Sequence, residues 1–328
     1  MENQKKTLFS MFNWNRANRP DAVEEDTTPT VKRYFKLLGR RFWQLVSLNL
    51  MMLPIILPVV LMAYLYFGFD KTPVENTVVF SQLYGANLIE QTPTSTFLLD
   101  LFGAQLMIPV YNVTTYILMG LCVLFLVITF GWQNVGSTYV LRNMVRGDAV
   151  FLVSDYFYAI KRNLKQGFFL GLIDFIVLFL LGFDLLYFWN SEITHANNLM
   201  FYGICAVGIL YFFMRFYLYL MLVTFDLSIR KIFKNALIFT TLGVKRNLMG
   251  LLGIALITFI NALLFPIFGA TPLGIAIPLI LPFLYYLAVM TFTSAYAAYP
   301  VIERYMITPY LKQQDEEETM EEAPDESL

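Results

Sequence analysis

Six long apolar stretches, separated by shorter polar segments, divide this chain of 328 residues. A bilayer core about 30 Å thick is crossed by about 20 helical residues, and each stretch is at least that long. The pattern therefore predicts an all-α fold, a polytopic membrane helix bundle with six transmembrane helices. The predicted spans cover residues 42–69, 113–135, 167–189, 199–225, 248–268 and 272–300.

Segments of mixed apolar and basic residues lie between or before these spans. From Val153 to Lys165 the apolar residues recur at helical spacing, and basic residues occupy much of the remainder. The segments 31–42 and 226–234 have a similar character. Helices of this kind lie in the membrane interface with their basic side toward anionic headgroups. We therefore predict amphipathic interfacial helices on the inner side of the membrane.

The remaining segments complete the predicted domain organisation. Residues 1–41 form a cytoplasmic arm that ends in the first basic interfacial helix, and residues 42–311 form the membrane domain. An outer insertion covers 70–112, and its apolar patch, 97–108, is too short to span, so we expect an interfacial or re-entrant segment. Residues 312–328 are rich in acids and are expected to be a disordered cytoplasmic tail.

Charge orients the predicted bundle. The chain is 58% hydrophobic and only 14% charged, which is far more apolar than a soluble domain. Of its 23 Lys and Arg residues, only Lys71 and Arg215 lie outside the segments that are cytoplasmic when the N-terminus is inside. This distribution follows the positive-inside rule. We expect a multi-pass protein with both termini in the cytoplasm.

Arg215 is the most unusual residue of the predicted spans. It precedes Asp226 at the inner boundary by eleven residues, which places it roughly 16 Å deep, near the bilayer centre. A charge at that depth costs about 2.5–3.5 kcal/mol, so it should face protein and a counter-charge. Asp174 in the third span is the first choice of partner, and Asp184 is the second. The pair is either a structural link between two helices or part of a substrate or proton pathway.

Four prolines mark possible helix breaks, Pro54 and Pro58 in the first span and Pro278 and Pro282 in the sixth. A proline removes one backbone donor and frees the carbonyl four residues earlier. Broken helices often line binding sites in transporters, but a kink can also serve packing alone. The sequence leaves both interpretations open.

Recognisable enzyme chemistry is missing from the sequence. It contains no HExxH, GxSxG, phosphate-binding glycine loop or CxxC motif, and only one histidine and two mid-span cysteines. We therefore expect a non-enzymatic protein without catalytic residues, cofactor or metal. The basic residues flank membrane spans, so anionic lipid headgroups are the expected partners and nucleic acid is not.

Short internal echoes suggest a repeat. KRNL occurs at 161–164 and 245–248, each time between an amphipathic segment and a span, and PIILP at 54–58 resembles PLILP at 278–282. Internal repeats are common in transporters. The echoes predict duplication of a two-helix unit.

Several stretches resemble the YesL-like family of bacterial integral membrane proteins, a domain of unknown function. MFNW at 11–14 is similar to the opening of that family. The blocks at 138–166 and 225–237 are similar to its two inner loops, and NL at 49–50 with LP at 53–54 is similar to its first span. The resemblance implies a bacterial cell-membrane protein associated with carbohydrate uptake, and it transfers no site residues.

Two functional hypotheses follow. The first is an accessory component of a carbohydrate transport system, which would contact transporter subunits through its inner amphipathic helices. The alternative is a secondary transporter with a mid-membrane site around Arg215 and Asp174. A membrane enzyme would need a cluster of polar residues at one boundary, which the sequence does not display.

Overall fold

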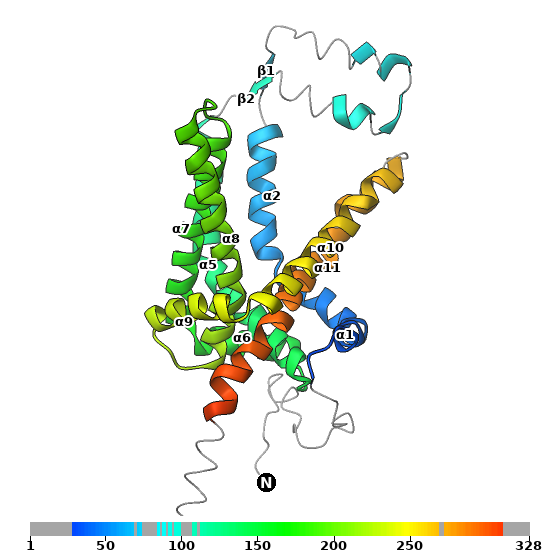
Figure 1. Cartoon of the computed structure of the whole chain (residues 1–328). Helices are drawn as coiled ribbons and strands as arrows, with labels where there is room; N and C mark the ends of the chain where they lie inside the picture. Colours follow the sequence, from blue (N-terminus) through cyan, green and yellow to red (C-terminus); the bar gives the residue numbers. More distant parts are fainter. Residues whose placement is uncertain are drawn as a thin grey trace, which may run out of the picture.

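The chain is described by a computed structural model at residues 28–68, 71–73, 84–85, 87–89, 91–93, 95–99, 107–109, 112–268 and 272–310. Its helices are α1 (Val31–Met51), α2 (Leu53–Gly68), α5 (Val113–Arg146), α6 (Leu152–Arg162), α7 (Leu164–Trp189), α8 (His195–Thr224), α9 (Ile229–Leu242), α10 (Val244–Phe268) and α11 (Pro272–Ile302), followed by the π-helical turn η3 (Glu303–Ile307) (Figure 1). Two short strands, β1 (Lys71–Pro73) and β2 (Met107–Pro109), pair antiparallel. The expected acidic tail and most of the expected N-terminal arm lie outside the described residues.

The described helices define a multi-pass membrane protein. Five of them are long and apolar enough to cross a bilayer, and a sixth candidate exists if α1 and α2 together form one bent span. The third to sixth predicted spans agree with α7, α8, α10 and α11 to within a few residues. The differences lie in the first two spans and in the outer insertion.

The predicted first span, 42–69, is divided between two helices, and the division lies beside Pro54, one of the predicted breaks. α1 continues to Met51, and α2 starts at Leu53 after a bend of 52°. The bend directly precedes Pro54, which has no N–H to continue the ladder of α1. The interfacial helix is therefore about ten residues longer than predicted. α2 has 16 residues, or roughly 24 Å, so this segment is long enough to cross a bilayer only as the bent pair of α1 and α2.

The second span and the insertion also differ from the prediction. α5 continues eleven residues beyond 135, because its last three turns are buried among neighbouring helices rather than exposed as a loop. In the insertion, Met107 and Ile108 belong to β2, where Ile108 pairs with Thr72. The expected interfacial or re-entrant segment 97–108 thus ends in a strand, and the fold is all-α except for this ribbon.

The same order of elements occurs three times in the bundle. We call the end that holds α1, α6 and α9 the basic end, and the end that holds β1 and β2 the ribbon end (Figure 1). In each unit, an amphipathic helix (α1, α6 or α9) leads into a helix that runs to the ribbon end (α2, α7 or α10). A third helix (α5, α8 or α11), which we call the return helix, then runs back to the basic end. The return helices contact one another. α6 packs on α5, α9 packs on α8, and α1 packs on α11, so the first unit closes against the last.

The short similar sequences, KRNL and PIILP/PLILP, coincide only in part with this structural repeat. KRNL at 161–164 spans the turn at Asn163, whereas KRNL at 245–248 lies within α10, after the turn at Gly243. PIILP belongs to α2 and PLILP to α11, which run in opposite directions. The amphipathic-helix-to-span junction is therefore the repeated feature, and the proline echo is not.

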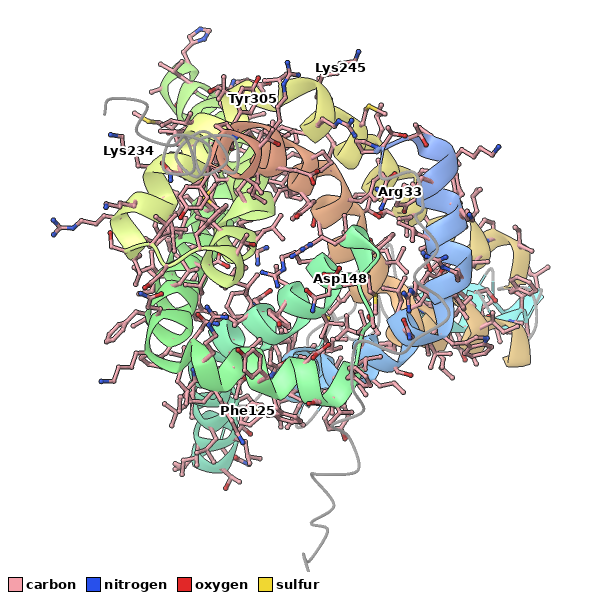
Figure 2. All side chains as sticks on the ribbon, turned by 90° about the horizontal axis from the view of Figure 1, so that it is seen from below. Arg33, Phe125, Asp148, Lys234, Lys245 and Tyr305 are labelled. Carbon is pink, nitrogen blue, oxygen red and sulfur yellow. The ribbon has the colours of Figure 1, made fainter. Side chains whose placement is uncertain are left out.

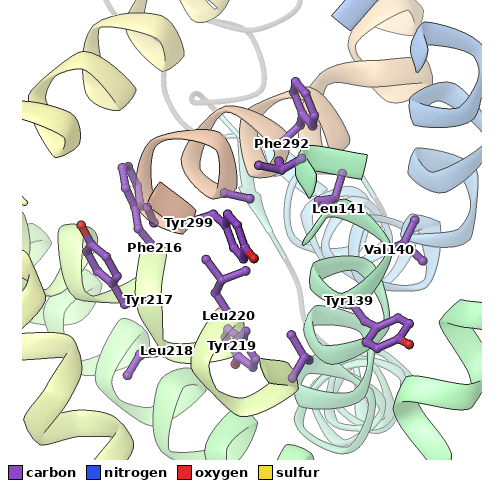
Figure 3. Close-up of a cluster of buried hydrophobic side chains, with 14 of the residues drawn as sticks. Tyr139, Val140, Leu141, Phe216, Tyr217, Leu218, Tyr219, Leu220, Phe292 and Tyr299 are labelled. Carbon is purple, nitrogen blue, oxygen red and sulfur yellow. The ribbon is translucent and has the colours of Figure 1, made fainter. Parts of the chain in front are cut away.

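The bundle is packed at the basic end and open at the ribbon end. Most residues of 131–145, 216–223 and 288–302 are buried, and Figure 3 shows part of this core, including Leu141, Leu220 and Tyr299. The ribbon-end parts of α5 and α8 are mostly exposed, and the α10–α11 hairpin leans away from α2 (Figure 1). Exposed apolar surface on candidate spans suits lipid contact.

A buried asparagine joins the first helix to the last. The Asn49 side chain donates through Nδ2 to the Phe283 carbonyl at 2.6 Å, and its Oδ1 accepts from the Ala288 amide at 2.8 Å. These groups follow Pro282 in α11, so the amide of Asn49 is inserted into the backbone ladder there. α11 nevertheless runs as one helix through Pro278 and Pro282, and α2 runs through Pro58. Of the four predicted breaks, only Pro54 accompanies a separation between helices.

Candidate functional site

Arg215 and Asp174 meet between α8 and α7. The Nε of Arg215 lies 3.0 Å from Oδ1 and 3.1 Å from Oδ2 of Asp174. Asp174 is fully buried. Asp184, the second-choice partner, lies ten residues further along α7, is half-buried and has no ion pair with Arg215 in the described chain. The first-choice residues are the ones that the structure brings together.

Two tyrosines complete the polar environment of Asp174. The hydroxyl of Tyr211 donates to Oδ1 at 2.8 Å, and that of Tyr219 donates to Oδ2 at 2.8 Å. Neither tyrosine was predicted from the sequence, although the signal was present. Tyr211, Arg215 and Tyr219 are four residues apart, which places them on one face of α8. The carboxylate therefore has a donor set that suits its charged form in an apolar environment.

The guanidinium of Arg215 is only partly used by this pair. Nε is the only nitrogen of Arg215 that has an acceptor within the described residues. Its side chain remains 29% exposed, and its central carbon lies 5.8 Å from the centre of the Phe130 ring. Arg215 also lines a cavity, and its terminal N–H groups have no acceptor among the described residues.

A cavity of about 290 Å³, which we call the central cavity, lies among the return helices and their neighbours. Most of its wall is apolar and includes Phe130, Phe212 and Phe216. Its polar lining residues are Asn134, Thr138, Arg215, Tyr219, Thr291 and Ser294. A mainly apolar cavity with a few convergent polar groups is typical of small-molecule sites, although this volume is at the lower end of the roughly 300–1,000 Å³ that such sites have.

The cavity offers acceptors as well as donors. Asn134 donates through Nδ2 to the carbonyl of Phe130, and its Oδ1 has no partner in the described part of the chain. The hydroxyls of Thr291 and Ser294 donate to carbonyls of their own helix, which leaves oxygen lone pairs available. Because Arg215 and Asp174 neutralise each other, the polar wall carries no net charge. The arrangement suits a neutral molecule that both donates and accepts hydrogen bonds.

The central cavity lies deep in the bundle. Arg215 precedes the end of α8 at Thr224 by nine residues, or roughly 14 Å along the helix. On the side of the basic end, the next turn of each return helix is buried, at Leu141, Val223 and Tyr299. The cavity is therefore separated from the basic end by packed side chains.

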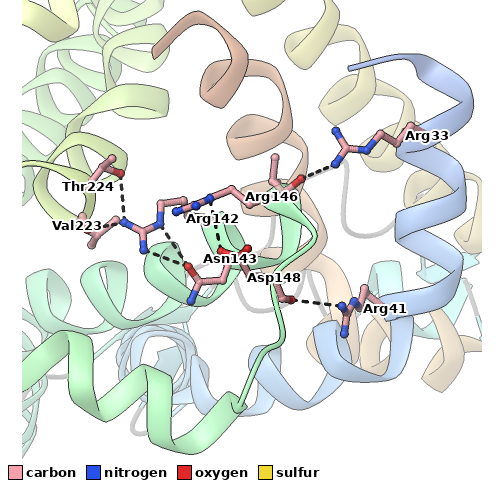
Figure 4. A network of polar contacts seen from close by, with 9 residues as sticks. Arg33, Arg41, Arg142, Asn143, Arg146, Asp148, Val223 and Thr224 are labelled. Carbon is pink, nitrogen blue, oxygen red and sulfur yellow. Dashed lines mark hydrogen bonds and ion pairs between the residues drawn. The ribbon is translucent and has the colours of Figure 1, made fainter. Parts of the chain in front are cut away.

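A second arginine, Arg142, is buried near the end of α5 and was also not predicted from the sequence (Figure 4). Its Nη1 donates to the carbonyl of Val223 at 2.7 Å, and its Nη2 donates to Oδ1 of Asn143 at 3.0 Å. Its guanidinium also lies 4.7 Å from the centre of the Tyr139 ring. The carbonyls at the end of α8 carry the negative end of the helix dipole, which favours a cation. Arg142 therefore links α5 to α8 and caps α8, without a carboxylate partner in the described chain.

The fold and these two polar centres define the class of the molecule: an α-helical, multi-pass membrane protein with a buried ion pair beside an intramembrane cavity. Comparisons with protein-family models, with curated proteins and with solved structures give no match. The resemblance to the YesL-like family therefore stays a prediction.

Proposed function

We propose that this protein binds a small, neutral, hydroxyl-rich molecule in the central cavity, as a secondary transporter does at its mid-membrane site. The observation that carries the proposal is the position of Arg215, which lines the cavity while its Nε is held by Asp174. A purely structural pair would need no cavity beside it. The expected ligand class includes sugars, which agrees with the carbohydrate uptake that the family resemblance implies.

The chemistry of the wall supports this ligand class. Hydroxyl groups can accept from Arg215 and donate to the Oδ1 of Asn134, and the apolar face of a sugar ring can pack on Phe130 or Phe212. Transporter sites commonly lie near the bilayer midplane at the interface between repeats. We propose a bacterial cell membrane as the location, with the basic end in the cytoplasm and the cavity accessible from the other side.

Ligand-induced stabilisation tests the proposal. Purified protein in mild detergent would be heated with a panel of neutral sugars and polyols, with small carboxylates and amines as contrast. A ligand at 100 times its Kd stabilises the folded state by about 2.7 kcal/mol, so at least one neutral polyhydroxyl compound should raise the melting temperature in a saturable manner.

Variants locate the effect in the cavity. Ser294→Leu places a larger apolar side chain in the cavity and leaves both residues of the ion pair in the sequence, and it should abolish the ligand-induced shift. Thr241→Leu, an exposed position on α9, is the matched control and should keep the shift. Equal shifts in both variants, or no saturable shift with any compound, would count against binding in this cavity.

A second candidate is an accessory component of a carbohydrate transport system, and the packed basic end favours it. An accessory protein needs no path across the membrane, and the cavity is separated from the basic end by Leu141, Val223 and Tyr299. On this proposal, the exposed apolar residues of α6, such as Val153 and Phe157, would contact transporter subunits. Purification from native membranes in mild detergent tests it, and recovery of the chain alone would contradict it.

A further inference from the structure

A large hollow lies at the basic end, apart from the central cavity. Its volume is about 530 Å³, and it lies between the α6–α7 junction and the end of α8. One wall is formed by residues 161–166, and the other by residues 222–226. It shares no lining residue with the central cavity.

The hollow is strongly basic. Lys161, Arg162 and Lys165 line it, and Asp226 is the one carboxylate among its lining residues. Neither Arg162 nor Lys165 forms an ion pair within the described chain. Three cations gathered on one hollow create a local field that attracts anions.

The helix that starts at this hollow adds to its positive field. α7 begins at Leu164, and the first turn of a helix carries the positive end of its dipole. The preceding Asn163 does not cap this turn, because its side-chain amide donates back to the carbonyl of Ala159 at the end of α6. The first-turn amides of α7 therefore add donors beside the three cations.

The position of the hollow indicates what kind of anion it meets. Two candidate spans end here, α7 at Leu164 and α8 at Thr224, so the hollow lies at the level where a bilayer presents its headgroups. The apolar side chains of Leu164 and Phe169 are exposed on α7 beside and beyond it. A molecule with an anionic head and an apolar tail fits both features.

The two equivalent junctions gather fewer cations. At α9–α10, the hydroxyl of Tyr217 packs against Gly243 and donates to the Oδ1 of Asn247 at 2.6 Å. A cavity of about 260 Å³ lies beside the start of α10, but Arg246 is the one cation among its lining residues, and it donates to the carbonyl of Pro29. At α1–α2, Met52 is buried, and Asn49 is used by α11. Among the three described junctions, the one at α6–α7 therefore gathers three cations around one hollow.

We propose that this hollow is a binding site for the phosphate headgroup of an anionic phospholipid of the inner leaflet. Lys161, Arg162 and Lys165 would hold the phosphate, and the acyl chains would lie along Leu164 and Phe169 of α7. The proposal is independent of the ligand in the central cavity, and it goes beyond general attraction between a basic surface and a membrane because it names one site.

Lipid retention tests the site. The full chain would be equilibrated in nanodiscs of phosphatidylcholine and phosphatidylglycerol, transferred to mild detergent, and analysed by native mass spectrometry for bound lipid. The wild type should retain phosphatidylglycerol in preference to phosphatidylcholine. Because each cation near a membrane surface contributes roughly fivefold in affinity, Lys161→Gln/Arg162→Gln/Lys165→Gln should weaken retention on the order of 100-fold.

A matched triple variant separates the site from overall charge. Arg230→Gln/Lys231→Gln/Lys234→Gln removes three exposed cations from α9, another of the amphipathic helices, and these cations do not line the hollow. Figure 2, which looks onto the basic end, shows Lys234 pointing away from the bundle. This control should retain phosphatidylglycerol as the wild type does, and so should Lys161→Arg/Lys165→Arg, which keeps the charges.

Three results would overturn the proposal. Equal loss in both triple variants would assign retention to overall charge. Wild-type retention in the variant of the hollow would show that the lipid binds elsewhere. Thermal stabilisation by inorganic phosphate without any retained lipid would assign the hollow to a soluble anion.

Discussion

Arg215 and Asp174 form an ion pair in which one nitrogen serves both carboxylate oxygens, with Nε 3.0 Å from Oδ1 and 3.1 Å from Oδ2. Tyr211 and Tyr219 each add one bond to the same carboxylate. Asp174 is thus fully satisfied, whereas Arg215 retains unused donors at the cavity. This asymmetry makes the aspartate the positioning residue and the arginine the group available to a ligand.

Asp174→Asn tests the structural side of this relationship. The substitution removes the counter-charge and leaves the largely buried guanidinium of Arg215 without its ion-pair partner. Breaking a buried pair by removing one partner costs about 3–5 kcal/mol, and we expect a loss of that order in the free energy of unfolding. Reversible unfolding in mixed micelles of detergent and lipid measures it.

Asp184→Asn is the matched control, because it lies on the same helix without an ion pair to Arg215. Its effect should stay within about 0.5 kcal/mol. The double variant Asp174→Asn/Arg215→Met removes both charges and should regain part of the lost stability, since neighbouring residues couple. Equal effects of Asp174→Asn and Asp184→Asn would contradict the assigned pairing.

Sequence patterns were sufficient for the parts of the fold that depend on single helices. Hydropathy located α7, α8, α10 and α11 to within a few residues, because a span must hold an apolar run of fixed length. The depth of Arg215 and its need for a counter-charge pointed to Asp174. The four-residue spacing of Tyr211, Arg215 and Tyr219 places both tyrosines on the same helix face as the arginine. Tyrosines are common in spans, however, so this spacing alone does not identify them as partners of Asp174.

The features that depend on packing between distant segments were not predictable in the same way. Polar residues such as Thr138 and Arg142 looked like an inner loop, because hydropathy does not register that neighbouring helices satisfy them. The hydrogen bonds of Asn49 join residues more than 230 positions apart in the chain. The α9–α10 junction is contacted by Tyr217 of α8 and by Pro29, which precedes α1. Both residues belong to other units of the repeat, so the sequence of the junction itself does not reveal these contacts.

Asn49→Ala should destabilise the bundle. The variant leaves the Phe283 carbonyl and the Ala288 amide without their partner, and an unsatisfied buried polar group costs about 1–3 kcal/mol. Asn49→Asp, of the same shape, should also be destabilising because it cannot donate to the Phe283 carbonyl. Unfolding in the same mixed micelles measures both.

Asn190→Ala provides the comparison for Asn49. Asn190 also donates to a helix carbonyl, that of Leu186, but at an exposed position. Its replacement should change stability by no more than about 0.5 kcal/mol. A near-neutral Asn49→Asp would show that the shape of the side chain matters there and its donated hydrogen bond does not.

Gly131→Ala should disrupt the contact between α5 and α7. A Cβ at this position would collide with the backbone carbonyl of Gly167 and lie 2.8 Å from the Cα of Gly171. Backbone cannot move aside as a flexible side chain can, and overpacking costs about 1–3 kcal/mol. The unfolding midpoint should therefore fall.

Gly120→Ala, on the same helix, is the control for Gly131. A Cβ there meets no atom within 4 Å, so alanine should add up to about 1 kcal/mol through its higher helix propensity. Opposite signs for the two substitutions are the expected result. A loss at Gly120 equal to that at Gly131 would mean that α5 is contacted along both positions, for example by a second copy of the chain.

Orientation in the membrane can be read from two single-cysteine variants in a background where Cys122 and Cys205 are replaced by alanine. Glu192→Cys lies in the loop between α7 and α8, and Ser228→Cys lies between α8 and α9. Because Lys and Arg gather at the basic end, the positive-inside rule predicts that Ser228 lies in the cytoplasm. A membrane-impermeant maleimide should therefore label the Glu192→Cys variant in intact cells and the Ser228→Cys variant only after permeabilisation. The reverse pattern would invert the bundle, so the hollow between α6 and α8 would face the outer leaflet and the proposed inner-leaflet lipid site would be untenable.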